Sequence, residues 1–344
     1  MRVGICGYPG SGKSTVFTAL APGGRTDRDV AFGNIKVPDT RVDFLASVFK
    51  PKKTTYAEVT FVDVGGGRGA AGGAFPPEVL QAMRNADVLV HVVRGFENPS
   101  LTTPPDPARD EQMFNDELLL LDLSILEKRA ERFKKESKKG PEVDVNKKCI
   151  DHLETGAPLR TADLGEEDIK ALGPGIQLLS LSPIITLYNL SEQAWADPKN
   201  AKLREARTAQ NSSWLAICGA IEAEIAAMPA EDQGEFLQGL GLGEPARNGF
   251  IRSAYGLLDL IAFLTAGPDE CRAWPLRRGT NARKAAGKVH SDIERGFIRA
   301  EIYRPEDLKT LGSEAALKAQ GKMRVEGKDY VMQDGDVVNF RFNV

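Results

Sequence analysis

The sequence predicts an α/β protein with a doubly wound, mainly parallel sheet, a helical insertion and a small C-terminal β-grasp module. Two observations indicate the sheet. Continuous apolar runs such as Asp87 to Val93 alternate with helical segments, and a glycine-rich loop joins the first apolar run to the first helix. Ligands of such sheets bind at the carboxyl ends of the strands. We therefore expect a ligand site beside the glycine-rich loop.

The strands of the main sheet are expected at five places. Most are continuous apolar runs, and one alternates apolar with polar residues and ends in an acid. In chain order they are residues 3–6, 58–63, 87–93, 183–189 and 214–218. Helical stretches, among them 15–20 and 77–85, lie between them. This alternation is typical of a parallel sheet with helices on both faces.

The glycine-rich loop has the spacing G-x-x-x-x-G-K-[ST] between a strand and a helix, which is that of a phosphate-binding loop. Its N–H groups would bind phosphates at the positive end of the helix, and Lys13 would reach the β- and γ-phosphates. A glycine-rich turn with a chance lysine is the alternative. The residues expected to bind the nucleotide are Tyr8, Pro9, Gly10, Ser11, Gly12, Lys13, Ser14 and Thr15.

The strand 58–63 ends in the pattern D-x-x-G, which begins at Asp63. Beside a phosphate loop, such an aspartate holds Mg²⁺ directly or through water, and the glycine N–H senses the γ-phosphate. We expect Asp63 and the Ser14 hydroxyl to be the Mg²⁺ ligands. Lys13 and Gly66 are the residues expected to act in catalysis.

Two turns at the ends of later strands are expected to hold the base. Asn189-Leu190-Ser191-Glu192 lies where a GTPase carries N-K-x-D, and Cys218-Gly219-Ala220 lies where an S-A-K-like turn would be. The expected base-binding residues are Asn189, Leu190, Glu192, Cys218 and Gly219.

Between the strands 87–93 and 183–189 the chain leaves the α/β pattern. Apolar residues recur at spacings of three and four from Met113 to Lys139, which predicts a long amphipathic helix that returns through a second over 145–153. A C-terminal module with strands 296–303, 328–332 and 337–342 follows. The expected domains are 1–112 and 176–267 (nucleotide-binding), 113–175 (helical insertion) and 268–344 (C-terminal module).

Composition predicts a soluble protein of a reducing compartment. Hydrophobic residues make up 42% of the 344 residues, and no apolar run approaches the roughly 20 residues of a membrane span. The four cysteines form no C-x-x-C pair, so no disulfide or metal framework is expected. No targeting peptide is expected before the strand that begins the chain. We therefore expect a cytoplasmic protein without membrane contact.

These motifs, in this order, resemble the YchF subfamily of Obg-related P-loop NTPases, the Obg-like ATPases. The resemblance covers nearly the whole chain, including VPDTRVDFLA, FVDVGG, ADVLVHVVRGFEN, NLSE, CGAIEAEIA, AWPLRRGTNARKAAGKVHSDIERGFIRAE and KDYVMQDGDVVNFRFN. It implies a Ras-like G domain, and it identifies the last two segments as the subfamily's TGS domain. It also implies a nucleoside-triphosphate hydrolase associated with ribosomes.

The resemblance also implies a base preference. In a GTPase the aspartate of N-K-x-D accepts hydrogen bonds from guanine, and adenine lacks both donors. Here the acid is Glu192, one methylene longer, and Leu190 replaces the lysine. The subfamily's N-x-x-E pattern goes with ATP, so Asn189 and the Leu190 backbone should recognise adenine. ATP is therefore expected, with GTP as the alternative.

The groups that position water in related enzymes are missing. The subfamily has a hydrophobic residue where Ras-type enzymes have glutamine, and this chain has Gly67. Thr103 takes the place of a histidine proposed to assist catalysis in the subfamily. Switch I, residues 22–32, is short and offers only Thr26 as a weak metal ligand, and switch II, residues 65–73, is glycine-rich. The loop reads Y-P-G-S-G-K-S-T instead of L-P-N-V-G-K-S-T. We expect slow hydrolysis, or binding with almost none.

Two basic regions suggest a nucleic-acid partner. Residues 127–148 carry nine Lys/Arg against five Asp/Glu, and residues 271–304 carry nine against three. Such surfaces fit electrostatic contact with RNA phosphates, and a charged, solvated surface is the alternative. No aromatic platform for single-stranded bases and no recognition of DNA sequence are expected. Three functions stay open: a ribosome-associated ATPase switch, a non-hydrolysing scaffold, and a GTPase.

Overall fold

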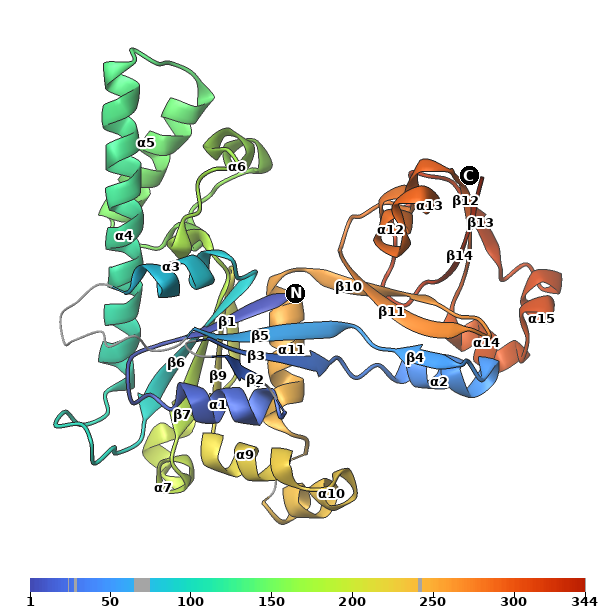
Figure 1. Cartoon of the computed structure of the whole chain (residues 1–344), viewed down its shortest axis with the longest axis horizontal. Helices are drawn as coiled ribbons and strands as arrows, with labels where there is room; N and C mark the ends of the chain where they lie inside the picture. Colours follow the sequence, from blue (N-terminus) through green and yellow to red (C-terminus); the bar gives the residue numbers. More distant parts are fainter. Residues whose placement is uncertain (24, 28–29, 65–74, 241–242, 344) are drawn as a thin grey trace. The chain divides into compact units, whose positions relative to one another are not determined.

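The structure is a computed structural model that describes residues 1–23, 25–27, 30–64, 75–240 and 243–343. The chain forms two compact units. The first consists of Met1–Ile35 and Thr60–Leu257, and the second of Lys36–Val59 and Leu258–Val344. Figure 1 shows the elements of each. Among the described residues, no helix is both long and apolar enough to cross a lipid bilayer.

The first unit contains a sheet of eight strands in the order β2-β3-β5-β1-β6-β7-β9-β8. They are β1 (Arg2–Cys6), β2 (Arg25–Asp27), β3 (Val30–Lys36), β5 (Glu58–Val64), β6 (Val88–Gly95), β7 (Ile184–Leu190), β8 (Arg207–Ala209) and β9 (Ser212–Ile217). Strand β1 pairs in parallel with β5 and β6, and the parallel run continues through β7 to β9, whereas β8 is antiparallel. The doubly wound, mainly parallel sheet is confirmed.

Helices cover both faces of this sheet (Figure 1). They are α1 (Lys13–Leu20), α3 (Pro77–Arg84), α7 (Glu192–Ala196), α8 (Ala201–Arg204), α9 (Gly219–Ala227), α10 (Ala230–Gly239) and α11 (Ala246–Leu257), with the 3₁₀ turn η3 (Pro198–Asn200). On one face, Met83 of α3 and Phe114 of the insertion pack with Leu89 of β6 in one buried cluster. The parallel strands thus bring the expected site residues to one edge of the sheet.

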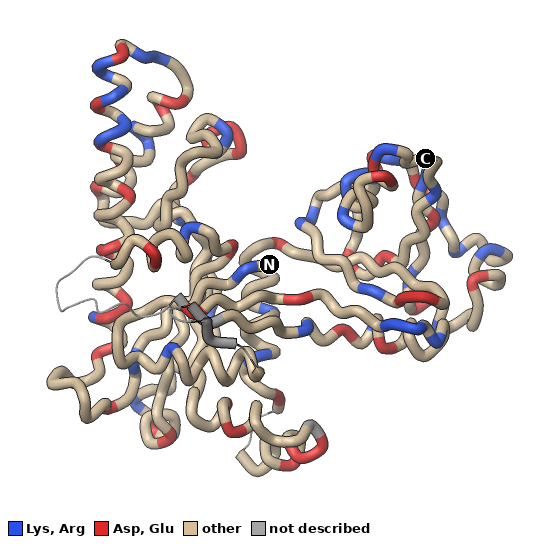
Figure 2. The backbone as a smooth tube through the Cα atoms, in the orientation of Figure 1, with Lys and Arg blue, Asp and Glu red and all other residues tan. Residues whose placement is uncertain are grey.

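The insertion is a helical hairpin. It consists of α4 (Pro107–Lys135), α5 (Pro141–Glu154), η1 (Leu159–Thr161), α6 (Glu166–Leu172) and η2 (Leu179–Leu181). Helix α4 begins earlier than the apolar pattern predicts, because the Asp106 side chain caps it by accepting from the Arg109 N–H at 3.1 Å. Buried Leu126 of α4 packs with Cys149 of α5. Figure 2 shows Lys and Arg alternating with Asp and Glu towards the end of this hairpin.

The second unit contains a sheet of six strands in the order β13-β12-β14-β10-β11-β4. They are β4 (Lys53–Thr55), β10 (Leu260–Thr265), β11 (Glu270–Arg277), β12 (Phe297–Tyr303), β13 (Arg324–Glu326) and β14 (Val337–Phe342). The helices are α2 (Thr40–Phe49), α12 (Ala282–Val289), α13 (Ser291–Arg295), α14 (Pro305–Leu311) and α15 (Glu314–Ala319). One buried cluster joins Ala285 of α12 to Phe263 of β10 and Ile302 of β12, as in a β-grasp module.

The predicted strand 328–332 is wrong. Tyr330 N–H bonds to the Gly327 carbonyl and closes a turn, and the short strand β13 precedes it. The residues after the turn bond to the start of α12: the Tyr330 carbonyl accepts from Ala282 N–H, and Met332 N–H donates to Thr280. These two bonds form an isolated antiparallel bridge between Val331 and Asn281, the residue that caps α12, and the segment does not extend into a strand.

The second unit contains more of the chain than residues 268–344. It begins at Leu258 because β10 pairs with both β11 and β14. It also takes residues 36–59, because Val42 and Leu45 of α2 are buried with Tyr303 of β12. The compact units therefore divide the chain differently from the four expected domains.

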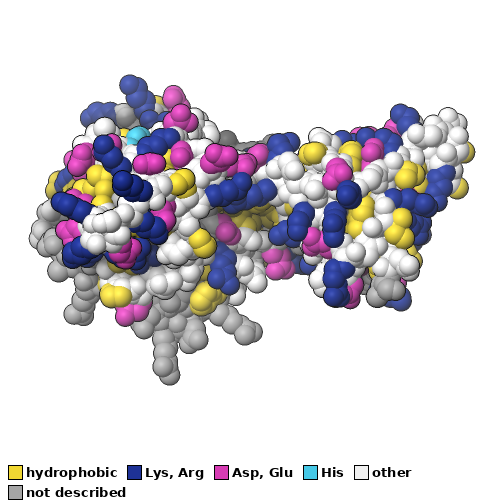
Figure 3. All heavy atoms as spheres, turned by 90° about the horizontal axis from the view of Figure 1, so that it is seen from above, with side chains coloured by type: hydrophobic (Ala, Val, Ile, Leu, Met, Phe, Trp, Pro, Cys, Tyr) yellow, Lys and Arg dark blue, Asp and Glu magenta, His cyan; other side chains and the backbone are white. Residues whose placement is uncertain are grey.

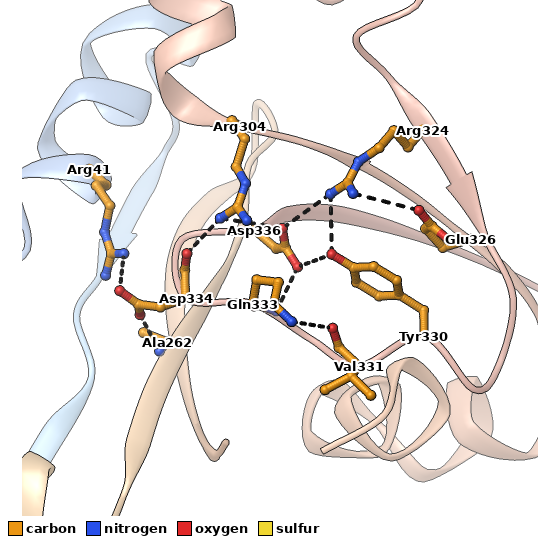
Figure 4. Close-up of polar contacts among 10 residues, drawn as sticks. All are labelled: Arg41, Ala262, Arg304, Arg324, Glu326, Tyr330, Val331, Gln333, Asp334 and Asp336. Carbon is orange, nitrogen blue, oxygen red and sulfur yellow. Dashed lines mark hydrogen bonds and ion pairs between the residues drawn. The ribbon is translucent and has the colours of Figure 1, made fainter. Parts of the chain in front are cut away.

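The turn 333–336 attaches α2 to the C-terminal strands (Figure 4). Asp334 accepts hydrogen bonds from Arg41 Nη1 at 2.8 Å and from Ala262 N–H at 2.9 Å. Asp336 is fully buried and pairs with Arg304 at 3.6 Å and with Arg324 at 3.7 Å. Removing a partner of such a buried carboxylate is costly, so the turn fixes the fold of this unit.

Candidate functional site

The phosphate loop between β1 and α1 requires its glycines. Gly10 and Gly12 have φ of +78° and +84°, where other residues are strained. A Cβ on Gly7 would lie 2.5 Å from the Val92 carbonyl oxygen, and one on Gly12 would lie 2.2 Å from Asn189 Nδ2. Both the backbone conformation and the lack of space therefore explain the sequence pattern.

The Lys13 side chain folds back over this loop. Its ammonium donates to the carbonyls of Gly7 at 2.9 Å and of Tyr8 at 3.0 Å, and the residue is buried. Burial lowers the pKa of Lys13, while the Asp63 carboxylate raises it. The ammonium thus has neutral carbonyls as its hydrogen-bond partners. It is poised to pair with a phosphate, which would stabilise the charge.

Asp63 and Ser14 lie together, as the sequence predicts. The Ser14 hydroxyl lies close to the buried Asp63 carboxylate at the end of β5. Burial raises the pKa of Asp63, and Lys13 and Ser14 lower it. One oxygen of this carboxylate, Oδ1, has no hydrogen-bond partner among the described residues. An orphaned carboxylate oxygen beside a hydroxyl fits Mg²⁺, which prefers such ligands. Gly66 lies outside the described residues, as do residues 65–73 and the side chain of Thr26.

Asn189 ties the base side of the site to the phosphate loop. Its Nδ2 donates to the Ser11 carbonyl at 3.1 Å, and its Oδ1 accepts from the Gly219 N–H at 3.0 Å. Cys218 immediately precedes α9 and is buried. One hydrogen of the Asn189 amide stays available for a ligand. The structure thus brings together three segments that are far apart in the sequence.

Leu190 and Glu192 lie in different environments. The Leu190 side chain is 2% exposed, packs with Tyr188, and would contact a Cβ on Gly95 at 2.4 Å. It is therefore part of the core, and only its backbone is left for a base. Glu192 is exposed in the first turn of α7, after the Ser191 cap. Burial raises the pKa of the Cys218 thiol, and the Glu192 charge adds to this effect.

Sequence reasoning missed the segment 96–104, which covers the phosphate loop. Arg94 is buried at the end of β6 and donates to the carbonyls of Thr103 at 2.7 Å and Pro104 at 3.1 Å. Asn98 Nδ2 donates to the Gly10 carbonyl at 3.3 Å. A charged residue at the end of a continuous apolar strand was the available signal, because a buried arginine needs several acceptors.

The three histidines make contacts that are structural in kind. His91 is fully buried in β6 and stacks on Phe114 with ring centroids 3.8 Å apart. Burial lowers the pKa of His91 to about 3. His152 contacts the Pro158 carbonyl within the insertion, and the His290 ring caps α13.

The basic residues of 271–304 are mostly paired with acids. Those with a carboxylate partner are Arg272, Arg278, Lys284, Arg295, Arg299 and Arg304. In the described part of the chain, Arg277, Arg283 and Lys288 have none within ion-pair distance. Figure 3 shows Lys and Arg among Asp and Glu over this unit. The uncompensated positive charge is therefore smaller than the composition suggests.

Two family models match the chain. Residues 2–121 match the family described as 50S ribosome-binding GTPase. Residues 260–343 match the YchF-GTPase C-terminal family, described as a protein of unknown function (DUF933). These matches correspond to the part of the chain with the phosphate loop and to the C-terminal strands.

Curated relatives match along the full length. The chain is 39% identical to the ribosome-binding ATPase YchF of Escherichia coli O157:H7 over 361 aligned residues, which cover 100% of this chain and 99% of that protein. It is 38% identical to the protein of the same name from Bacillus subtilis (strain 168), with 100% of each covered. It is 34% identical to the Obg-like ATPase 1 of Oryza sativa subsp. japonica, with 100% and 92% covered.

A solved structure agrees with these matches. The Schizosaccharomyces pombe YchF GTPase superposes with a TM-score of 0.86 at 30% identity, covering 99% of this chain and 97% of that one. Together with the phosphate loop, the Asp63–Ser14 pair and the Asn189 tie, these likenesses show that the chain belongs to the YchF subfamily of P-loop NTPases.

Proposed function

We propose that the chain binds ATP with Mg²⁺ at the phosphate loop and hydrolyses it slowly, as a cytoplasmic, ribosome-associated switch. The observation that supports this most strongly is the assembled loop. Lys13 at the start of α1 and the residues Asp63 and Asn189 at the ends of β5 and β7 meet around it. When bound, Mg²⁺ would neutralise phosphate charge, held by Ser14 and Asp63. Lys13 would supply the second positive charge.

The preference for ATP is supported by the residues expected to contact the base. Guanine requires a carboxylate fixed at its N1–H and amino group, and Glu192 is exposed and one methylene longer than aspartate. Asn189 has a free amide hydrogen for an adenine acceptor. A GTPase is the second candidate, because the Schizosaccharomyces pombe relative is named a GTPase.

The proposal of slow hydrolysis is supported by the absence of a histidine that could assist catalysis beside the phosphate loop. Thr103 replaces the histidine of the subfamily, and its carbonyl is held by Arg94. No described histidine side chain hydrogen-bonds to the phosphate loop. Because a positioned acid–base group is worth about a hundredfold or more, its absence predicts a low intrinsic rate.

A ribosomal partner is suggested by the names of the relatives and by charge. The E. coli and B. subtilis proteins are named ribosome-binding ATPases. In this chain, Lys134, Lys135 and Lys139 at the end of the hairpin are exposed and have no carboxylate partner within the described part. With Arg283 and Lys288 of α12, they offer charge for RNA phosphates. We infer no membrane partner and no recognition of DNA sequence.

The test compares ATP and GTP affinities and single-turnover hydrolysis, with and without ribosomes. Tight ATP binding with ribosome-stimulated turnover supports the switch. Binding without turnover under either condition supports a scaffold, and stronger GTP binding supports a GTPase. Lys13→Ala should weaken ATP binding by about 1.5–3 kcal/mol, the worth of a charge-assisted hydrogen bond. Unchanged affinity in calorimetry would place the nucleotide elsewhere.

A further inference from the structure

Tyr8 connects the phosphate loop to the helical insertion. The subfamily pattern has leucine at this position, which offers no hydroxyl. Here the half-buried ring packs edge-on to Phe114 of α4, with centroids 6.4 Å apart and an interplanar angle of 83°. The Glu117 carboxylate, one turn further along α4, lies close enough to the Tyr8 hydroxyl for its charge to raise the pKa of Tyr8, after the larger effect of burial.

The same carboxylate holds a second segment. Glu117 Oε1 accepts from the Phe75 N–H at 3.2 Å, and the Phe75 ring lies edge-on to Phe114 at 5.7 Å. Phe75 lies just before α3, on the stretch that runs from Asp63 to that helix. One side chain of α4 therefore lies beside Tyr8 of the phosphate loop and holds the backbone that leads into α3.

The surroundings make this arrangement stiff. Phe114 is completely buried and stacks on His91 of β6, so α4 is fixed against the sheet at this point. Glu117 is partly buried, and burial raises its pKa while its two donors lower it. Hydrogen bonds to a carboxylate contribute more than neutral ones, and more so away from water.

We propose that Glu117 is a positioning residue for triphosphate hydrolysis. By holding Tyr8 and Phe75 against α4, it keeps the start of the phosphate loop and the approach to α3 in one arrangement. It contacts neither phosphate nor base, so it should affect the rate more than the affinity. This inference rests on the proposed NTPase function. It also implies that the hairpin and the nucleotide site are mechanically linked.

The experiment uses the full chain and four variants. Tyr8→Phe keeps the ring and removes the hydroxyl, and Glu117→Ala removes the acceptor. Glu117→Gln keeps an accepting oxygen and serves as the conservative rescue. Asp116→Asn is the matched control, because it removes a neighbouring exposed charge of α4 that bonds only to Gln112 in the described chain.

We expect single-turnover ATP hydrolysis to fall about tenfold in Tyr8→Phe and Glu117→Ala, since small misplacements cost that much or more. ATP affinity should stay within about twofold. The double variant should be no slower than Glu117→Ala alone, because that substitution already removes the contact with Tyr8. Glu117→Gln should keep most of the rate, and Asp116→Asn all of it.

If the wild-type protein hydrolyses ATP too slowly to be assayed, a second measurement tests the same inference. Hydrogen exchange over Phe75–Arg84 should slow when a non-hydrolysable ATP analogue binds, and this protection should be lost in Glu117→Ala. The positioning role would be overturned if variants that bind ATP normally hydrolysed it at the wild-type rate or kept the wild-type protection from hydrogen exchange. It would also be overturned if Asp116→Asn lost as much hydrolysis or protection as Glu117→Ala. Failure of the wild type to bind any triphosphate would instead overturn the proposed function.

Discussion

Replacing Asn189 by alanine should lower both the stability of the first unit and its affinity for ATP. The carboxamide makes two buried hydrogen bonds, at 3.1 Å to the Ser11 carbonyl and at 3.0 Å from the Gly219 N–H. Asn189→Ala leaves both backbone groups without these partners. Each buried group left without a partner costs about 1–3 kcal/mol, so the two together predict a loss of about 2–6 kcal/mol in the free energy of unfolding of the first unit.

The assay combines urea unfolding with ATP calorimetry. Trp214 on β9 reports unfolding of the first unit, and ATP affinity should fall by at least about tenfold because the loop loses its anchor. Asn189→Asp separates the two bonds, since it keeps the acceptor for Gly219 and loses the donor to Ser11. Asn339→Ala on β14 is the control, because this residue is exposed. Unchanged stability and ATP affinity in Asn189→Ala would refute the conclusion that Asn189 anchors the phosphate loop to the start of α9.

Three further predictions concern the base, the rate and acid stability. Glu192→Asp with Leu190→Lys should shift the ratio of GTP to ATP affinity by at least about tenfold, near 1.4 kcal/mol; an unaltered ratio in calorimetry would assign the preference to the Cys218 turn. Thr103→His should raise single-turnover ATP hydrolysis about tenfold without changing affinity, since its side chain is exposed and its backbone is held by Arg94; an inert variant that binds normally would contradict this. Burial lowers the pKa of His91 from 6.5 to about 3, so the unfolded chain binds the extra proton between these values and stability falls as pH falls. His91→Phe should therefore remove about 2 kcal/mol of the stability loss between pH 7 and pH 5, and identical urea midpoint shifts in both proteins would show that His91 does not titrate in this way.

The strands and loops nearest the nucleotide were predictable because their signals are local. A continuous apolar run specifies a buried strand whatever surrounds it, and the glycines around Lys13 are required by φ and by space within one turn. The pairing of Ser14 with Asp63 also followed, because parallel strands bring their carboxyl ends to one edge.

Elements with short or competing patterns were less predictable. The start of α4 lies in polar residues where only the Asp106 cap indicates a helix. The alternation in 328–332 suggests a strand, but its backbone groups bond to the start of α12. Arg94 and its three carbonyl acceptors were missed, because a buried charge is not specified by its own sequence neighbours.

The sequence by itself determined the fold class, the family and the position of the glycine-rich loop between β1 and α1, because these depend on periodicity and on fixed spacing within short segments. Only the tertiary structure decided which side chains meet across long separations. It placed Asn189 between the loop and α9, buried Leu190 in the core, joined Arg41 to Asp334, and set Tyr8 and Phe75 on Glu117. Such contacts depend on the packing of whole elements, and the cost of leaving buried polar groups unpaired selects among them.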